Sequence, residues 1–203
     1  MLETGVIVRA TDPAEVEALH ALAALTFPLA CPQSTTEAAK AAFIAEHLSA
    51  QRFGEYLADP SRVVLVAVAQ GRAESAGRVP VAVPVPVPVA VGASGGLVGY
   101  AILAHGEPID PDVARVVRQR PTAELSKLYV HPAQHGGGVA GALVEALLEG
   151  AASRGARSVW LGVNIHNTRA NRFYEKSGFV VVGHKGFLVG AVIEDDWVRE
   201  REL

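Results

Sequence analysis

The glycine-rich run at residues 135–141 has the residue types of an anion-binding loop. Its sequence is His-Gly-Gly-Gly-Val-Ala-Gly, and it leads into an apolar segment with helical spacing over residues 139–152. Glycine lets a backbone turn tightly and approach a ligand, and the first N–H groups of a helix have no partner within that helix. These residues predict either a phosphate held at a helix N-terminus or a tightly packed turn without a ligand.

Two common nucleotide-binding patterns do not fit this run. A Walker loop requires Gly-Lys followed by Ser or Thr, and that sequence is missing here. The dinucleotide fingerprint requires an acidic residue at the end of the next strand, but the strand predicted over residues 158–163 contains none. Backbone N–H groups, rather than a lysine, are therefore expected to bind the anion.

The glycine run also matches the first cofactor motif of a known family. With the strand before it and the helix after it, it resembles the GCN5-related N-acetyltransferases (GNAT), whose loop reads Arg/Gln-x-x-Gly-x-Gly/Ala. Gly138 and Ala140 fit this loop, whereas His135 replaces the usual glutamine or arginine. Histidine can donate a hydrogen bond but is mostly neutral at pH 7. The backbone amides of the loop, rather than the His135 side chain, are therefore expected to bind the phosphate.

A second motif lies downstream at the separation that this family shows. The pattern Asn167-x-x-Ala170-x-x-Phe173-Tyr174-x-x-x-Gly178-Phe179 has the form of the family's second cofactor motif. The resemblance covers the chain apart from a Val/Pro-rich insertion and a connector at residues 107–120. Within the family, the early helices, the strand around Tyr100 and the acidic segment near the end resemble the branch of bacterial polyamine acetyltransferases most.

The resemblance implies that acetyl-coenzyme A is the cosubstrate and that no metal is needed. Cofactor contacts are expected from the glycine loop, from a strand that splays away from its neighbour, and from one asparagine side chain. The residues at these positions are Leu128, Tyr129, Val130, His135, Gly136, Gly137, Gly138, Val139, Ala140, Gly141 and Asn167. Asn167 also has the residue type of an N-cap for the following helix, and both roles are compatible.

Direct transfer of an acetyl group to an amine requires a proton acceptor for the amine and a proton donor for the leaving thiolate. The resemblance assigns the donor role to Tyr174, although its place beside Phe173 also suits a core tyrosine. Glu124 lies eleven residues before His135, as the base glutamate does in the histone-acetylating branch, but it could equally be a solvated carboxylate. Ser126 and Gly162 stand where other branches have an acidic residue, and His131 is a further candidate that suits a turn.

The amine acceptor is expected between the first helices and the last strands. This position nominates six residues: Phe27, Cys31, Glu194, Asp195, Asp196 and Trp197. The acidic ones suit a cationic amine of a polyamine-like molecule or a peptide, although they could also form a polar turn between strands. Cys31 is the only cysteine and has no nearby histidine, so it is either a small buried residue or a thiol nucleophile.

The elements that position these residues follow from the apolar spacing. Helices are expected over residues 13–27, from Thr35 or Thr36 through 48, and over 51–58, 139–152 and 168–176. Strands are expected over residues 6–8, 63–68, 97–104, 124–130, 158–163 and 179–183, with a last one running from about 187 to 199. The succession predicts an α/β (α+β) fold: a mixed, mainly antiparallel twisted sheet of six to seven strands flanked by helices.

The Val/Pro-rich insertion at about residues 71–96 is the one segment with biased composition. Proline at nearly every second position removes the backbone donors that a central strand needs, so an extended hairpin tip is expected. A polyproline-type segment that recognises a partner is the alternative interpretation.

The composition limits the classes of function. The 203 residues fit a single N-acetyltransferase domain over residues 1–203, and the net charge of -3 provides no general field for nucleic acid, although Arg115, Arg118 and Arg120 cluster locally. No apolar run approaches the roughly 18 residues of a membrane span, so a cytoplasmic location is expected.

Family analogy favours a homodimer. A GNAT fold that binds acetyl-coenzyme A without catalysis, as a sensor or interaction module, is the alternative function.

Overall fold

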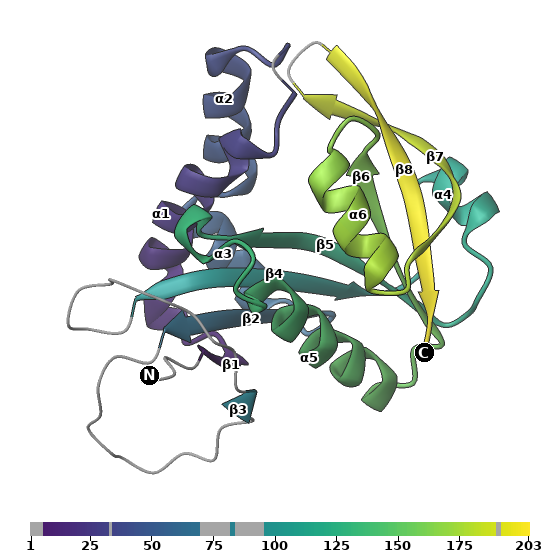
Figure 1. Ribbon diagram of the computed structural model, residues 1–203, viewed down its shortest axis with the longest axis horizontal. Helices are drawn as coiled ribbons and strands as arrows, with labels where there is room; N and C mark the ends of the chain where they lie inside the picture. Colours follow the sequence, from purple (N-terminus) through teal and green to yellow (C-terminus); the bar gives the residue numbers. More distant parts are fainter. Residues whose placement is uncertain (1–5, 33, 70–81, 84–95, 190–191) are drawn as a thin grey trace.

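A single mixed sheet organises the chain. The computed structural model describes residues 6–32, 34–69, 82–83, 96–189 and 192–203 (Figure 1). The strands are β1 (Val6–Ala10), β2 (Arg62–Ala69), β3 (Ala82–Val83), β4 (Leu97–His105), β5 (Thr122–Val130), β6 (Ser158–Asn164), β7 (Val180–Val189) and β8 (Val192–Glu202). Their order across the sheet is β3-β1-β2-β4-β5-β6-β8-β7.

The predicted fold class is confirmed. Every strand pair in the described sheet is antiparallel except β5 with β6. Seven strands have five or more residues, and the eighth, β3, is a two-residue strand on the edge beside β1. The parallel pair in the middle of the sheet is the feature that creates the site, because β5 and β6 join only briefly.

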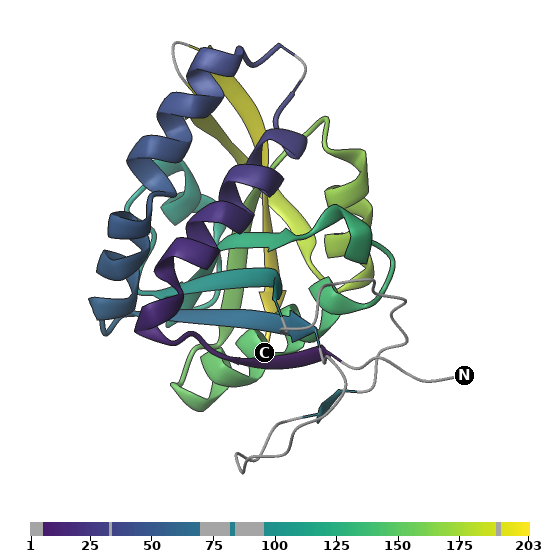
Figure 2. The same cartoon turned by 90° about the vertical axis from the view of Figure 1, so that its left-hand side faces the viewer.

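Helices cover both faces of the sheet. They are α1 (Val16–Thr26), α2 (Glu37–His47), α3 (Ala50–Ala58), α4 (Pro111–Val116), α5 (Val139–Ser153) and α6 (Thr168–Lys176), with short 3₁₀ turns η1 (Pro13–Glu15), η2 (Phe27–Leu29) and η3 (Pro132–Gln134). On one face, α5 and α6 share a core with the inward side chains of β5 and β6. On the other face, α1 and α3 pack on β2 and β4, as seen from the side in Figure 2.

Helices α6 and α2 begin at the capping residues that the sequence indicated. The Asn167 side chain caps α6 by accepting from the N–H of Ala170, and Gly178 follows the helix with a positive φ of 82°. Thr36 caps α2 in the same way, by accepting from the N–H of Ala39. A short polar side chain at the start and a glycine after the end therefore predict these helix limits well.

One helix was not predicted, and the limits of the last two strands were wrong. The connector at residues 107–120 contains α4, which begins with an Asp110 cap and Pro111, the same signal that starts the first helix at Asp12. Instead of strands at 179–183 and 187–199, β7 and β8 form one long hairpin in which Phe187 belongs to β7, and the acidic residues Glu194 to Asp196 lie within β8 rather than in a turn. Except for Ala82–Val83 and Gly96, the predicted Val/Pro-rich insertion lies outside the described residues.

Candidate functional site

The site forms where β5 and β6 separate. The two strands pair at only three positions, of which Glu124 opposite Trp160 is the last. Beyond it, β6 stays paired with β8 up to Asn164, and β5 stays paired with β4 up to Val130. The two strands therefore diverge, and a pocket occupies the gap between them.

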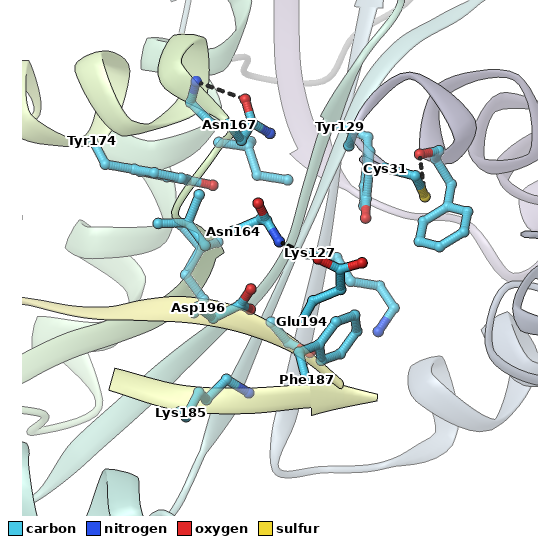
Figure 3. A pocket seen from close by; sticks show the side chains of 18 of the residues that line it. Cys31, Lys127, Tyr129, Asn164, Asn167, Tyr174, Lys185, Phe187, Glu194 and Asp196 are labelled. Carbon is cyan, nitrogen blue, oxygen red and sulfur yellow. Dashed lines mark hydrogen bonds between the residues drawn. The ribbon is translucent and has the colours of Figure 1, made fainter. Parts of the chain in front are cut away.

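The pocket gathers nine of the residues that the sequence nominated. They are Phe27, Cys31, Glu124, Leu128, Tyr129, Asn167, Tyr174, Glu194 and Asp196. Twelve residues that were not nominated as site residues complete the lining, although Ser126, Gly162 and Ala170 among them were noted in the sequence: Ala30, Pro32, Phe43, Leu125, Ser126, Lys127, Gly162, Val163, Asn164, Ala170, Lys185 and Phe187. The structure thus brings the predicted donor end, on α6, and the predicted acceptor end, on η2 and β8, to one cavity (Figure 3).

Backbone groups of β5 also face this gap. His131 donates its N–H to the carbonyl oxygen of Val98, and residues along an antiparallel ladder alternate in the side to which their backbone groups point. The backbone groups of Tyr129 therefore point to β4, while those of Leu128 and Val130 point toward the gap. Tyr129 was expected to use its backbone, but it is its side chain that lines the pocket.

The glycine loop follows β5 directly and has an anion-binding geometry. Gly136 and Gly138 adopt φ values of 83° and 80°, a conformation that glycine reaches without strain. Gly138 is the N-cap of α5 and has no side chain, so no side chain caps the first N–H groups of this 15-residue helix. Those groups, with the positive end of the helix dipole, are available for an anion.

His135 is exposed, but both of its ring nitrogens contact groups of the protein. Its Nε2 lies 2.9 Å from the carbonyl oxygen of Val130, and its Nδ1 lies 2.7 Å from a guanidinium nitrogen of Arg169. A second guanidinium nitrogen of Arg169 lies 2.9 Å from Nε2. Because the carbonyl oxygen of Val130 can only accept, Nε2 carries the proton and donates to it, and Nδ1 accepts from Arg169. Burial lowers the pKa of His135, and the charge of Arg169 lowers it further, so the ring is neutral.

Arg169 therefore provides a positive charge beside the glycine loop, where the neutral His135 provides none. It lies on α6 beside the glycine loop and shares a surface groove with Arg172 and Lys176. Sequence reasoning missed it because position 169 is an unspecified place in the second motif. Its contact with His135 spans 34 positions, so only the folded chain shows it.

Tyr174 reaches the pocket from α6. Its ring is 9% exposed and packs between Phe173 and Phe179, at centroid distances of 5.3 and 5.8 Å. Figure 3 shows its hydroxyl pointing into the cavity. Burial raises the pKa of Tyr174 above the ordinary value, so the phenol keeps its proton at neutral pH and can donate it.

Tyr129 stands across the cavity from Tyr174. Its ring stacks on Tyr100 at 5.5 Å, and burial raises its pKa, as do the nearby ionisable groups of Cys31, Tyr174 and Asp196 in that order. Tyr129, Tyr174 and Asp196 lie on β5, α6 and β8, and Cys31 lies just after η2. They act on one another because the pocket excludes much of the water between them. A second protonated phenol therefore faces the centre of the site.

Strand alternation separates the acidic residues of β8 into two sets. Glu194 and Asp196 line the pocket, whereas Asp195 and Trp197 do not. Trp197 faces the other side and packs on His184, with ring centroids 4.3 Å apart. The predictions that Asp195 and Trp197 belong to the acceptor pocket were therefore wrong, because successive side chains of a strand point to opposite faces.

Glu124, the predicted base, has a cationic neighbour in the pocket. Glu124 lies at the closed end of the gap, where β5 and β6 still pair, beside Lys127. Burial lowers the pKa of Lys127 to about 8, with the charge of Glu124 acting in the opposite direction, and its ammonium group lies 5.0 Å from the Tyr56 ring centroid. Whether Glu124 is the base stays a prediction at this point.

The described residues offer neither a metal site nor a membrane-spanning helix. No group of three or more His, Cys, Asp or Glu side chains in the described ranges could hold a metal ion. Within the same part of the chain, no helix has both the length and the apolar character needed to span a membrane.

Comparisons with known proteins agree with this geometry. Residues 81–179 match the acetyltransferase (GNAT) family. A protein of Mycobacterium tuberculosis named as an uncharacterized N-acetyltransferase is 42% identical over 93% of this chain and 98% of its own length. The chain therefore belongs to the GNAT acetyltransferase family, which confirms the predicted family and enzyme class.

Solved structures share the fold. The N-acetyltransferase PaiA of Thermoplasma acidophilum, solved with coenzyme A, aligns with a TM-score of 0.66 at 17% identity, covering 98% of this chain and 99% of that one. NAA60 of Arabidopsis thaliana, solved with acetyl-CoA, aligns with a TM-score of 0.68 at 16% identity, covering 98% of each chain. At these identities the likeness concerns the fold alone.

Proposed function

We propose that this protein transfers the acetyl group of acetyl-CoA directly to a primary amine while both are bound. The observation that supports this most is the gap between β5 and β6, which places a protonated phenol on one side of a cavity and carboxylates on the other. The two structural neighbours solved with coenzyme A or acetyl-CoA share the fold that creates this gap.

The cofactor's pyrophosphate would lie at the N-terminus of α5, against the amides of Gly138 to Gly141, with Arg169 as the nearby cation. From there its pantetheine arm would run along β5, where the backbone groups of Leu128 and the N–H of Val130 face the gap; the carbonyl oxygen of Val130 is bound by His135. The Asn167 side chain lines the same gap and uses its carbonyl oxygen to cap α6, so its amide nitrogen is the group that it would offer to the arm.

The reaction forms a C–N bond and breaks a C–S bond. The amine nitrogen attacks the thioester carbonyl carbon, and backbone N–H groups of β5 facing the gap would stabilise the oxyanion. When the C–S bond breaks, the sulfur takes a proton from Tyr174. An acceptor that arrives as an ammonium ion loses one proton to the solvent before the attack. Its nitrogen then gives up a second proton to a carboxylate of the pocket, and Glu124, Glu194 and Asp196 are the carboxylates that line it.

The same carboxylates favour an acceptor that arrives as a cation. Glu194 pairs with Phe187 across β7 and β8, and Asp196 lines the same pocket. The rings of Phe27, Phe43 and Phe187, which also line it, contact one another in series at centroid distances of 4.4 and 5.8 Å. This aromatic wall with acidic neighbours suits the alkyl chain and ammonium group of a small polyamine-like molecule or of a peptide. A cytoplasmic location and a homodimer are predictions that accompany this proposal.

The test is calorimetry with acetyl-CoA, followed by a panel of amines in a thiol-release assay. We expect binding, and turnover with at least one of spermidine and a peptide with a free amino terminus. Binding without transfer to any amine would favour the non-catalytic sensor instead. Absence of binding at millimolar acetyl-CoA would refute the proposal.

A further inference from the structure

A glycine leaves an opening on the floor of the pocket. Gly162 lies in the middle of β6, on the face that lines the cavity, and pairs with Val198. Here there is no side chain, and the space in front of Gly162 is occupied from the neighbouring strands.

The carboxylate of Asp196 fills part of that space. Asn164 pairs directly with Asp196, so Asp196 is the diagonal neighbour of Gly162 and shares its face of the sheet. Oδ2 of Asp196 lies 3.3 Å from the position that a Cβ at residue 162 would take, and Cε of Lys185 lies 2.5 Å from it. A carboxylate is therefore present beside Gly162, but it comes from β8 instead of β6.

This carboxylate is buried and incompletely paired. Asp196 is 6% exposed, and its Oδ1 has no hydrogen-bond partner among the described residues. Leaving a buried acceptor unsatisfied costs stability, so such a group in a pocket calls for a functional explanation. Figure 3 shows the Asp196 side chain pointing into the cavity that Tyr174 enters from the opposite side.

We propose that Asp196 is the general base of the reaction. The inference rests on the acetyl transfer proposed above. The acceptor's ammonium group first releases one proton to the solvent, because only the neutral amine has the lone pair needed for attack. As the amine nitrogen then bonds to the carbonyl carbon, Asp196 takes one further proton from that nitrogen. The C–S bond then breaks, and Tyr174 gives one proton to the sulfur. Asp196 returns its proton to the solvent and Tyr174 regains one, so the products are the acetylated amine and the free thiol of coenzyme A.

The surroundings of Asp196 suit this role. Burial raises its pKa to about 6; the charge of Lys185 on β7 opposes this, and Glu194 and Asp195 on its own strand add to it. Facing it from β6 are the uncharged Asn164 and Gly162, while the phenols of Tyr129 and Tyr174 face it from β5 and α6. A base is most effective when its pKa lies near the working pH, and an ordinary aspartate is too weak.

Glu124 is the rival base, and the two make different predictions. It lies where β5 and β6 are still paired, at the closed end of the gap. Leu128, whose backbone faces the gap, follows it by four positions along β5. We therefore expect Glu124 to affect the pocket's charge without setting the pH dependence of transfer.

The experiment compares pH profiles of kcat/KM, from about pH 5 to 9, for the wild type, Asp196→Asn, Glu124→Gln and Asp195→Asn. Asp195 is the matched control, because it precedes Asp196 but does not line the pocket. We expect the wild type to lose activity as the pH falls through about 6. We expect Asp196→Asn to lose that acid limb and roughly 10² to 10⁴-fold in kcat/KM, with acetyl-CoA affinity retained by calorimetry. Asp195→Asn should behave as the wild type, and Glu124→Gln should keep the limb.

An Asp196→Asn variant that keeps both the rate and the acid limb would overturn the inference while leaving acetyl transfer intact. Loss of the limb in Glu124→Gln would overturn it as well and identify the rival. If Asp196→Asn fails to fold, Asp196→Glu takes its place: a profile without the acid limb in that variant would overturn the inference, since the carboxylate is kept. A wild type that transfers to no amine overturns the proposed function and this inference with it.

Discussion

Replacing Asp196 by asparagine should stabilise the protein at pH 8. The folded state raises the pKa of this carboxyl from 3.8 to about 6, chiefly through burial. Folding therefore takes up a proton between these pH values, and the stabilising contribution of the protonated group is lost as the pH rises through 6. Asparagine has a similar shape and never ionises, so it avoids the cost of burying the charge.

The size of the effect follows from the shift. About two pKa units at 1.36 kcal/mol each give about 3 kcal/mol. Water reaches the pocket and screens part of this, so a gain of about 1 to 2 kcal/mol in the free energy of unfolding is expected at pH 8. At pH 4, where the folded wild type is protonated, the gain should be nearly absent.

Urea denaturation at pH 8 and at pH 4 measures both values, provided that the slope with denaturant is unchanged. Asp195→Asn is the control, and since Asp195 is exposed, its difference from the wild type should not depend on pH in this way. An Asp196→Asn variant that is equally stable as, or less stable than, the wild type at pH 8 would refute the reasoning. That result would mean that neighbouring groups offset the free-energy cost of burying the charged Asp196 carboxylate.

Three more substitutions test separate parts of the structure. Tyr174→Phe removes the proton donor but keeps the ring packing, so kcat should fall roughly 10² to 10⁴-fold while calorimetry shows unchanged acetyl-CoA affinity; full activity would exclude the donor role. Arg169→Gln removes the cation beside the glycine loop and should weaken coenzyme A binding about tenfold but leave pantetheine binding unchanged; equal effects on both would point to a general loss of structure. Gly183→Ala would bring a Cβ within 2.7 to 2.9 Å of the stiff Val116 side chain on α4, so urea denaturation should show a loss of about 1 to 3 kcal/mol. Gly150→Ala on α5 is its control, because open space surrounds that position and the helix should gain stability.

The sequence predicts the local structure of the cofactor end well. Helix limits and the glycine loop depend on neighbours in the chain, such as the Asn167 cap and the glycines of the turn. α4 was missed although Asp110-Pro111 repeats the start signal of the first helix, because a six-residue helix has too few apolar positions to show a period.

The acceptor end was predicted less well, because it depends on strand register. From the sequence, Glu194 to Asp196 could be a turn; only their pairing with β6 and β7 shows which of them face the pocket. The same register puts Asp196 beside Gly162, a relation between residues 34 positions apart in the chain. The contact of Arg169 with His135 is likewise a product of tertiary structure.

The measurement that tests the central claim most directly is the stoichiometry of transfer. The wild type is incubated with acetyl-CoA and an amine of the panel, and the free thiol and the acetylated amine, identified by mass spectrometry, are quantified together. We expect one thiol for each acetylated amine, with negligible thiol when the amine is omitted and little of either product with Tyr174→Phe. Bound acetyl-CoA without any acetylated amine, or thiol release that does not depend on the amine, would contradict direct transfer at the gap between β5 and β6.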